Sequence, residues 1–209
     1  MKKTRTALEL VTSSAEETQA LGERIGRLLQ PGDVIALHGE LGSGKTTLIQ
    51  GLAKGAGLSP DVVKSPTFVL IREYAGAVPL IHVDGYRLEG AVDAAWLDLD
   101  TVFSPQKITV IEWAERFAGL LPPEVLEVRL AHVSANRRRI SIESSGPRAR
   151  EIVTAVNKGD TKRSSTKLQI TKHQIPSTKQ SPSTTFQDPN SCLVIRSLVI
   201  GMCLELGAW

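Results

Sequence analysis

The chain has 209 residues, 41% of them hydrophobic and 22% charged, an ordinary balance for a globular protein with one well-packed domain. Its formal net charge of +3 is concentrated late in the sequence: residues 1–145 hold 16 basic and 18 acidic residues, whereas residues 146–209 hold 9 and 4. The first part therefore lacks the charge expected of a domain that binds nucleic acid through a basic face, and no apolar run is long enough to span a bilayer.

The first 60 residues alternate between strand-like and helix-like patterns. Ser13 and Ser14 stand three residues before Glu16 and Glu17, which is the spacing of a capping box at the start of a helix. Apolar residues then recur on one face, and a turn leads into an apolar run typical of a strand buried on both faces. The predicted elements are a strand over residues 6–11, a helix over 15–30, a strand over 34–37 and a helix over 47–56.

The next 80 residues add strands with shorter helices between them. We predict two hairpins and, between them, a second buried strand. The hairpins cover 68–74 with 78–83 and 125–133 with 139–142, a helix covers 91–97, the buried strand covers 108–111, and a short helix ends before Pro122 and Pro123. Strands that alternate with helices, with hairpins added, are typical of a three-layer α/β domain with a mixed β-sheet.

The composition changes after about Gly146. Residues 160–191 contain 12 serines and threonines but few apolar residues, so they cannot bury enough surface to offset their chain entropy, and we predict disorder. We divide the sequence into a folded α/β domain over residues 1–146 and a low-complexity basic tail over 147–209. The tail beyond about residue 150 is expected to be dispensable for the fold and for the activity of the domain. Its closing segment, 192–209, is apolar without an evident pairing partner.

A cytoplasmic location is expected. The basic start of the sequence is not followed by the apolar core of a secretory signal. The two cysteines, Cys192 and Cys203, make no metal-type spacing with the histidines and indicate no disulfide framework.

Residues 39–46 fit the phosphate-binding pattern G-x-x-x-x-G-K-[ST] at every fixed position. A buried strand precedes them and a helix comes after them, so successive backbone N–H groups can point at phosphate oxygens beside the positive end of the helix dipole. Lys45 is expected to reach the β- and γ-phosphates, and the Thr46 hydroxyl to ligate Mg²⁺. This context predicts a P-loop NTPase-like domain that binds ATP and Mg²⁺, and disfavours a chance glycine-rich turn. The predicted nucleotide-binding residues of the loop are Gly39, Glu40, Leu41, Gly42, Ser43, Gly44, Lys45, Thr46 and Thr47.

Two apolar strands end in acidic residues, Asp84 and Glu112. Carboxylates at the tips of strands beside a P-loop strand lie near the bound metal ion and the attacking water. One such acid alone is often a solvated residue, but two of them beside a P-loop favour a function. Lys45, Asp84 and Glu112 are therefore the predicted catalytic residues.

Four segments occur in the order and spacing of one protein family. They are the P-loop, Ser65-Pro66-Thr67-Phe68, His82-Val83-Asp84-Gly85-Tyr86-Arg87-Leu88 and Ile111-Glu112-Trp113. Over roughly residues 8–145 the sequence resembles the bacterial tRNA threonylcarbamoyladenosine biosynthesis ATPases, the TsaE (YjeE) family. The resemblance implies that Thr46 and Glu112 hold Mg²⁺ and that Asp84 serves the nucleotide site. It also implies a switch-like loop of Ser65, Pro66 and Thr67, and purine contacts near Ala15 and Asn136.

The resemblance further implies how such a protein acts. It implies that the chain is a Mg²⁺-dependent ATP hydrolase. Because no arginine of the sequence is clearly placed to reach the γ-phosphate, we expect hydrolysis by the chain alone to be slow and to rise when partners bind. Family members support formation of a modified adenosine beside the anticodon, together with the transferase subunits of a larger complex. The tRNA is expected to be handled by those partners, because the domain has no basic face. The tail after residue 146 departs from the family pattern.

Three alternatives stay open on the sequence. Asn157-Lys158-Gly159-Asp160 fits the guanine-reading motif N-K-x-D of GTPases, and residues 152–156 before it could be a strand. A small-molecule P-loop kinase would need a lid and an acceptor pocket, which residues 84–112 are too short to make evident. A nucleotide-gated assembly factor would bind ATP and barely hydrolyse it.

Overall fold

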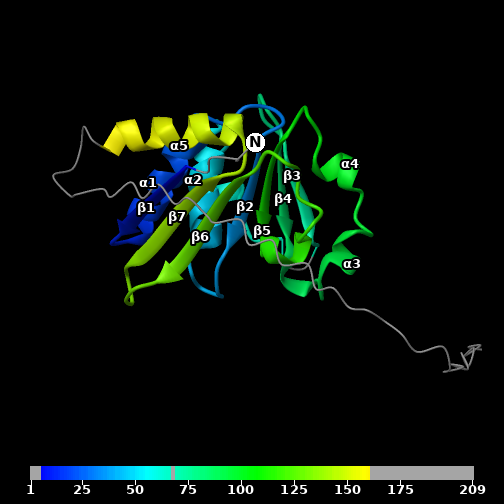
Figure 1. The fold of residues 1–209 in the computed structure, drawn as a ribbon, viewed down its shortest axis with the longest axis horizontal. Helices are drawn as coiled ribbons and strands as arrows, with labels where there is room; N and C mark the ends of the chain where they lie inside the picture. Colours follow the sequence, from blue (N-terminus) through cyan, green and yellow to red (C-terminus); the bar gives the residue numbers. More distant parts are fainter. Residues whose placement is uncertain (1–5, 67–68, 161–209) are drawn as a thin grey trace, which may run out of the picture. The chain divides into compact units, whose positions relative to one another are not determined.

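A computed structural model describes residues 6–66 and 69–160 of the chain (Figure 1). Seven strands form one sheet in the order β1-β7-β6-β2-β5-β4-β3. The four central strands β6, β2, β5 and β4 run parallel, whereas β1, β7 and β3 join antiparallel to their neighbours. The strands are β1 (Ala7–Thr12), β2 (Val34–His38), β3 (Ile71–Tyr74), β4 (Leu80–Asp84), β5 (Ile108–Glu112), β6 (Leu126–His132) and β7 (Arg138–Ser144). The mixed α/β sheet predicted from the sequence is confirmed.

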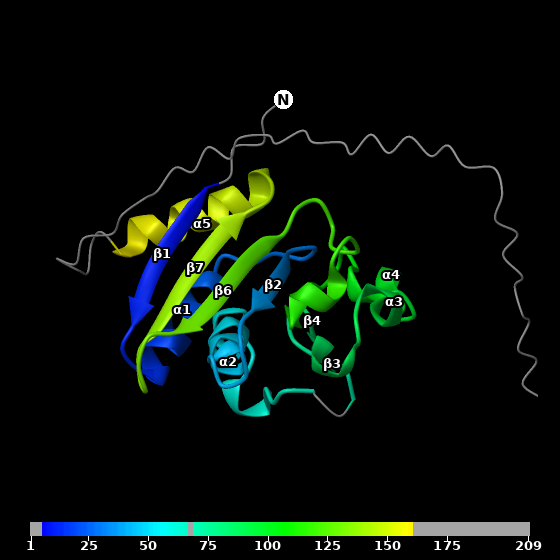
Figure 2. The ribbon, with the colours of Figure 1, turned by 60° about the horizontal axis from the view of Figure 1, so that its bottom comes forward.

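Helices cover both faces of this sheet. They are α1 (Ala15–Gly26), α2 (Lys45–Gly55), α3 (Ala91–Ala94), α4 (Leu99–Val102) and α5 (Pro147–Asp160), with 3-10 turns η1 (Pro60–Val62), η2 (Gly85–Arg87) and η3 (Ala114–Phe117). Figure 2 shows α1 and α5 beside the β1–β7 end, and α3 and α4 at the other end beside β4. The helix predicted over 15–30 ends at Gly26, and the strand predicted over 68–74 is described only from Ile71.

Two hydrophobic clusters, one on each face, show why the domain has three layers. Along β2, Ile35 and Leu37 belong to the cluster under α1, α2 and α5, while Val34 and Ala36 belong to the cluster under α3, α4 and η3. Successive strand residues point to opposite faces, so a strand covered on both sides must be apolar throughout. This is the physical basis of the apolar run that precedes the P-loop.

The first helix begins as its capping pattern predicts. Ser14 is the N-cap residue, and its hydroxyl accepts a hydrogen bond from the Glu17 N–H at 3.2 Å. The Glu17 carboxylate in turn accepts from the Ser13 N–H at 2.6 Å. The Glu17 N–H, which the helix leaves unpaired, and the N–H just before the N-cap residue are thereby satisfied, which fixes where α1 begins.

Helices α1 and α2 pack at unusually short range through pairs of glycines. A Cβ atom added to Gly22 would lie 2.2 Å from the Leu48 carbonyl oxygen, and one added to Gly51 would lie 2.0 Å from the Gln19 oxygen. Both contacts are with backbone, which cannot move aside as a side chain can. These glycines let α1 press against the helix that begins at the P-loop.

Helix α5 corrects the predicted domain boundary at residue 146. Residues 147–160 form a helix, and its side chains Ala149, Ile152, Val153 and Val156 are buried in the cluster that contains β1, β7 and α1. Their spacing of three and four residues is that of one helix face. Charged and polar residues stand between these four, so the composition averaged over the segment does not show the apolar face. The folded domain therefore extends through α5 to Asp160, beyond the boundary predicted at residue 146.

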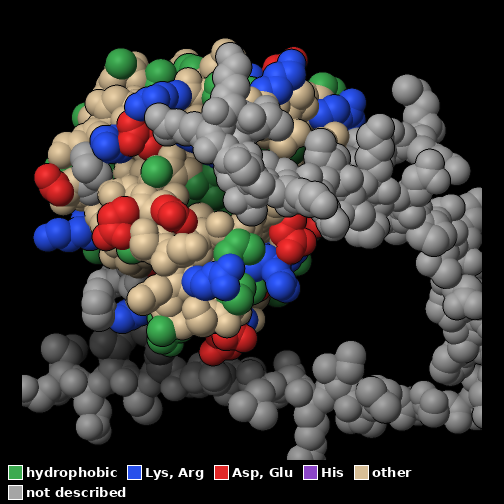
Figure 3. Space-filling model, turned by 90° about the vertical axis from the view of Figure 1, so that its left-hand side faces the viewer, with side chains coloured by type: hydrophobic (Ala, Val, Ile, Leu, Met, Phe, Trp, Pro, Cys, Tyr) green, Lys and Arg blue, Asp and Glu red, His purple; other side chains and the backbone are tan. Residues whose placement is uncertain are grey.

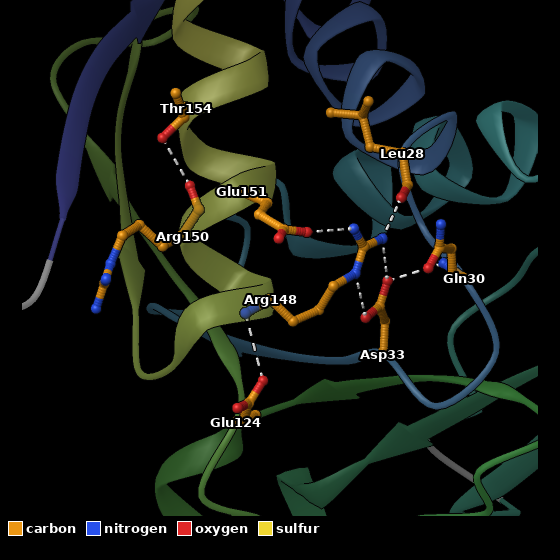
Figure 4. A network of polar contacts seen from close by, with 8 residues as sticks. All are labelled: Leu28, Gln30, Asp33, Glu124, Arg148, Arg150, Glu151 and Thr154. Carbon is orange, nitrogen blue, oxygen red and sulfur yellow. Dashed lines mark hydrogen bonds and ion pairs between the residues drawn. The ribbon is translucent and has the colours of Figure 1, made fainter.

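The start of α5 is fixed by Arg148, drawn in Figure 4. Its guanidinium donates to both carboxylate oxygens of Asp33, at 3.1 and 3.0 Å, and to the Leu28 carbonyl oxygen at 2.5 Å. A further contact reaches Glu151 at 3.3 Å. The paired hydrogen bonds to Asp33 raise the pKa of Arg148. Because Asp33 stands just before β2 and Leu28 just after α1, one side chain ties three elements together.

Other predictions concern residues that the structure does not describe. The disorder predicted over residues 160–191 concerns, from residue 161 on, residues outside the described ranges, and so do the two cysteines. Within the described ranges, no helix has the length and apolar character needed to cross a membrane. On the face shown in Figure 3, basic and acidic side chains are interspersed and do not form one basic patch.

Candidate functional site

The phosphate-binding loop lies between β2 and α2, as its motif predicts. Gly39, Gly42 and Gly44 have φ angles of 143°, 74° and 100°, a region that favours glycine. At Gly39 a Cβ atom would also lie 2.4 Å from the Leu130 carbonyl oxygen. Gly44 is the N-cap residue of α2, so the positive end of this helix opens onto the loop.

Lys45 is buried inside the loop, with an exposed fraction of 4%. Its ammonium donates to the carbonyl oxygens of Gly39 at 2.7 Å and Glu40 at 3.0 Å, and lies 4.0 Å from the centre of the Trp113 ring. Burial lowers the pKa of Lys45, and the negative charge of Glu112 opposes that shift. A buried cation held by loop carbonyls and a ring is suited to binding phosphate oxygens.

The two predicted acids meet at the carboxyl ends of neighbouring parallel strands. Asp84 of β4 is in register with Glu112 of β5, and both are buried. The Thr46 hydroxyl donates to Glu112 Oε1 at 3.0 Å. Asp84 accepts from the Ser65 hydroxyl at 2.7 Å and from the Tyr86 N–H at 3.0 Å. Hydroxyl and carboxylate oxygens are the ligands that Mg²⁺ prefers, so Thr46 and Glu112 fit the ion.

These groups line one hollow of about 450 Å³, which is large enough for a nucleotide. Its walls come from the P-loop, the strand ends and the residues next to them. The lining residues are Leu41, Gly42, Ser43, Gly44, Lys45, Thr46, Thr47, Ser65, Asp84, Tyr86, Glu112 and Trp113. The structure thus brings the P-loop, both acids and Ser65 of the predicted switch loop to a single site.

Other predicted site residues are not among those that line this hollow. Ala15 begins α1, and Asn136 lies between β6 and β7; neither is a lining residue, and their contact with a purine stays a prediction. Pro66 is described next to Ser65, whereas Thr67 lies outside the described residues.

Arg138 contacts the P-loop from outside the lining of the hollow, which the sequence did not indicate. In the sequence it belongs to a cluster of three arginines of the kind usually found at a solvated surface. In the structure its guanidinium donates to the carbonyl oxygens of Ser43 at 3.1 Å and Gly42 at 3.4 Å. It also donates to the Ser134 and Ala135 carbonyl oxygens in the turn between β6 and β7. Arg138 therefore joins that turn to the P-loop, which only the fold brings together.

Two aromatic residues flank the hollow. The rings of Tyr86 and Trp113 lie 5.2 Å apart, and Trp113 adopts a left-handed conformation with φ of 58°. Trp113 lines the hollow, as expected from its place in the sequence immediately after Glu112.

The guanine-reading alternative fails on position and conformation. Residues 152–156, considered as a strand, are helical, and Asn157 to Asp160 form the last turn of α5. Asn157, Lys158 and Gly159 are not among the residues that line the hollow. The motif therefore continues a helix and does not follow a strand, which removes the context on which the GTPase alternative depended.

Comparisons with known proteins agree with the geometry. The model of the family "Threonylcarbamoyl adenosine biosynthesis protein TsaE" matches residues 12–140. The chain is 36% identical over 150 residues to the tRNA threonylcarbamoyladenosine biosynthesis protein TsaE of Bacillus subtilis (strain 168), covering 71% of this chain and 93% of that one. The protein of the same name from Treponema pallidum (strain Nichols) is 36% identical over 135 residues, covering 65% of this chain and 99% of its own length. The crystal structure of Bacillus subtilis YdiB superposes with a TM-score of 0.65 and 32% identity, covering 75% of this chain and 97% of that one.

Proposed function

The chain belongs to the TsaE family of threonylcarbamoyl adenosine biosynthesis proteins, and from this we propose that it hydrolyses ATP in support of that tRNA modification. Membership of this family identifies a P-loop protein of the threonylcarbamoyladenosine pathway. Our proposal goes further in three respects: the chain hydrolyses ATP, it uses Mg²⁺, and it acts with transferase partners.

One observation carries the proposal of hydrolysis. The Thr46 hydroxyl and the Glu112 carboxylate meet at 3.0 Å at the mouth of the phosphate loop, with Asp84 on the neighbouring strand. A P-loop that only bound a nucleotide would need no second buried carboxylate beside the metal ligands. With two acids present, one can bind the metal ion while the other orients the attacking water.

Each of these residues takes a distinct part in the reaction. The loop N–H groups and the Lys45 ammonium bind the β- and γ-phosphate oxygens and stabilise the charge that develops on them. Thr46 and Glu112 would hold Mg²⁺, which neutralises phosphate charge when bound. Asp84, held by Ser65 and the Tyr86 N–H, orients the attacking water. The oxygen of that water bonds to the γ-phosphorus, the bond to the bridging oxygen breaks, and ADP and phosphate leave.

Turnover by the chain alone should be slow. Among the described lining residues, Lys45 is the single cation, and none is an arginine. An arginine supplied by a partner can raise the rate by roughly 10³–10⁵. We therefore propose stimulation by the transferase subunits of the modification complex, which would also hold the tRNA. A cytoplasmic site of action is part of the same proposal.

Phosphate release from ATP by the purified chain, with and without the transferase subunits, tests this function. Lys45→Ala serves as the inactive control. Slow release that rises with the subunits is expected. Tight ATP binding with no release under either condition would instead support a nucleotide-gated assembly factor. An acceptor-dependent loss of ATP would support a kinase.

A further inference from the structure

His82 lies in the middle of β4 and has no exposed surface. Its Nε2 atom is 3.0 Å from Glu112 Oε1. A carboxylate can only accept a hydrogen bond, so Nε2 carries the hydrogen and donates it. His82 pairs with Val110 in the parallel register, and Glu112 stands two residues further along β5 on the same face. The contact is therefore a consequence of the strand alignment.

The oxygen that accepts from His82 is the one that accepts from Thr46. Three elements, β4, β5 and α2, thus converge on one carboxylate oxygen. Two donors on Oε1 fix the rotamer of a long side chain, and leave its remaining lone pairs for other ligands. We propose that His82 is a positioning residue that holds Glu112 in the orientation in which Glu112 and Thr46 bind the divalent cation. The inference rests on the proposed function, since it concerns the same metal site.

A purely structural role explains His82 less well. Its neighbours along β4 are Leu80, Ile81 and Val83, all buried, so an apolar residue would fit this strand. The other ring nitrogen, Nδ1, is buried without a hydrogen-bond partner among residues 6–66 and 69–160. Burying an unpaired polar atom destabilises a fold. The His82 ring keeps one buried nitrogen without a partner while its other nitrogen bonds to the metal-site carboxylate. This arrangement indicates a role in the site.

Binding of Mn²⁺ to the ADP-loaded chain tests the inference, because free Mn²⁺ is measured directly by its paramagnetic resonance signal. His82→Leu removes the donor and keeps an apolar volume. His82→Gln keeps an amide N–H that can reach Glu112, and it loses no contact at Nδ1. His132→Gln is the matched control, because His132 is exposed on β6. ADP binding in EDTA and thermal unfolding in EDTA are measured for each variant.

His82→Leu should raise the Kd for Mn²⁺ by about 10- to 100-fold, the usual effect of removing a residue that orients a metal ligand. His82→Gln and His132→Gln should bind Mn²⁺ as the unaltered chain does, and ADP binding in EDTA should not change in any variant. An unaltered Mn²⁺ affinity in His82→Leu would overturn the inference. So would an equal loss of metal-free ADP binding, because that would show general damage.

Two further outcomes separate this inference from its premise. If the unaltered chain with ADP does not bind Mn²⁺, the proposed metal site is wrong and both proposals fall. If the unaltered chain binds Mn²⁺ but His82→Leu does not fold in EDTA, His82→Met is measured in the same way. Failure of both apolar variants to fold would assign His82 to stability alone and overturn the inference.

Discussion

Removing helix α5 should unfold or severely destabilise the domain, although the sequence predicts that this segment is dispensable. Ile152, Val153 and Val156 are 2%, 0% and 3% exposed. Burying each such side chain contributes about 1.5–3 kcal/mol, so three of them contribute roughly 5–9 kcal/mol before chain entropy is subtracted. The whole net stability of a domain is about 5–15 kcal/mol. The loss is therefore comparable to the total.

Two shortened chains separate the contribution of the helix from that of the residues after it. A chain ending at Asp160 should melt as the 209-residue chain does, whereas a chain ending at Gly146 should be largely unfolded by circular dichroism. Within the intact helix, Ile152→Ala should lower the free energy of unfolding by about 2–5 kcal/mol in a urea titration. The exposed Thr154→Ala should change it by less than about 0.5 kcal/mol. A Gly146-terminated chain as stable as the Asp160-terminated one would refute the reasoning.

The remaining predictions concern the site and the packing beneath it. Thr46→Ala should lower the rate of ATP hydrolysis by roughly 10²–10³, because it removes a contact that strengthens as charge develops. Glu112→Ala should reduce turnover far more than ATP binding, measured by calorimetry, because the P-loop backbone supplies most phosphate contacts. Gly51→Ala should lower the free energy of unfolding by about 1–3 kcal/mol or more, since its Cβ would lie 2.0 Å from a backbone oxygen of α1. Burial lowers the pKa of His38, so the unfolded chain takes up a proton first as the pH falls below about 6.5, and stability should fall from there toward the folded pKa.

Each of these has a control within the chain. Thr46→Ser keeps the hydroxyl and should retain most of the activity. Gly159→Ala, where an added Cβ meets nothing within 4 Å, should not destabilise the protein. For the pH dependence, His38→Gln should flatten the loss of stability below about pH 6.5, and the exposed His132→Gln should not. Full activity in Thr46→Ala, or full activity in Glu112→Ala together with an inactive Asp84→Ala, would show that the site roles are assigned wrongly.

The sequence alone determined the phosphate loop and the acids at the strand ends. The loop is local: eight consecutive residues, a strand before and a helix after them dictate its shape, whatever the rest of the chain does. Asp84 and Glu112 could be predicted together because the carboxyl ends of parallel strands meet at one edge. The three layers could be predicted too, since β2 is apolar on both faces.

Only the tertiary structure decided which distant residues complete the site and where the domain ends. Arg138 reaches the P-loop because β7 places its first residue beside a loop that stands 95 residues earlier. His82 contacts Glu112 through a strand register that no local pattern encodes. Helix α5 has an apolar stripe too sparse to stand out in its composition, and it is held because β1, β7 and α1 present a surface to cover. Contacts of this kind join residues that are far apart in the sequence and adjacent only in the folded domain. The spacing of neighbouring residues therefore cannot predict them.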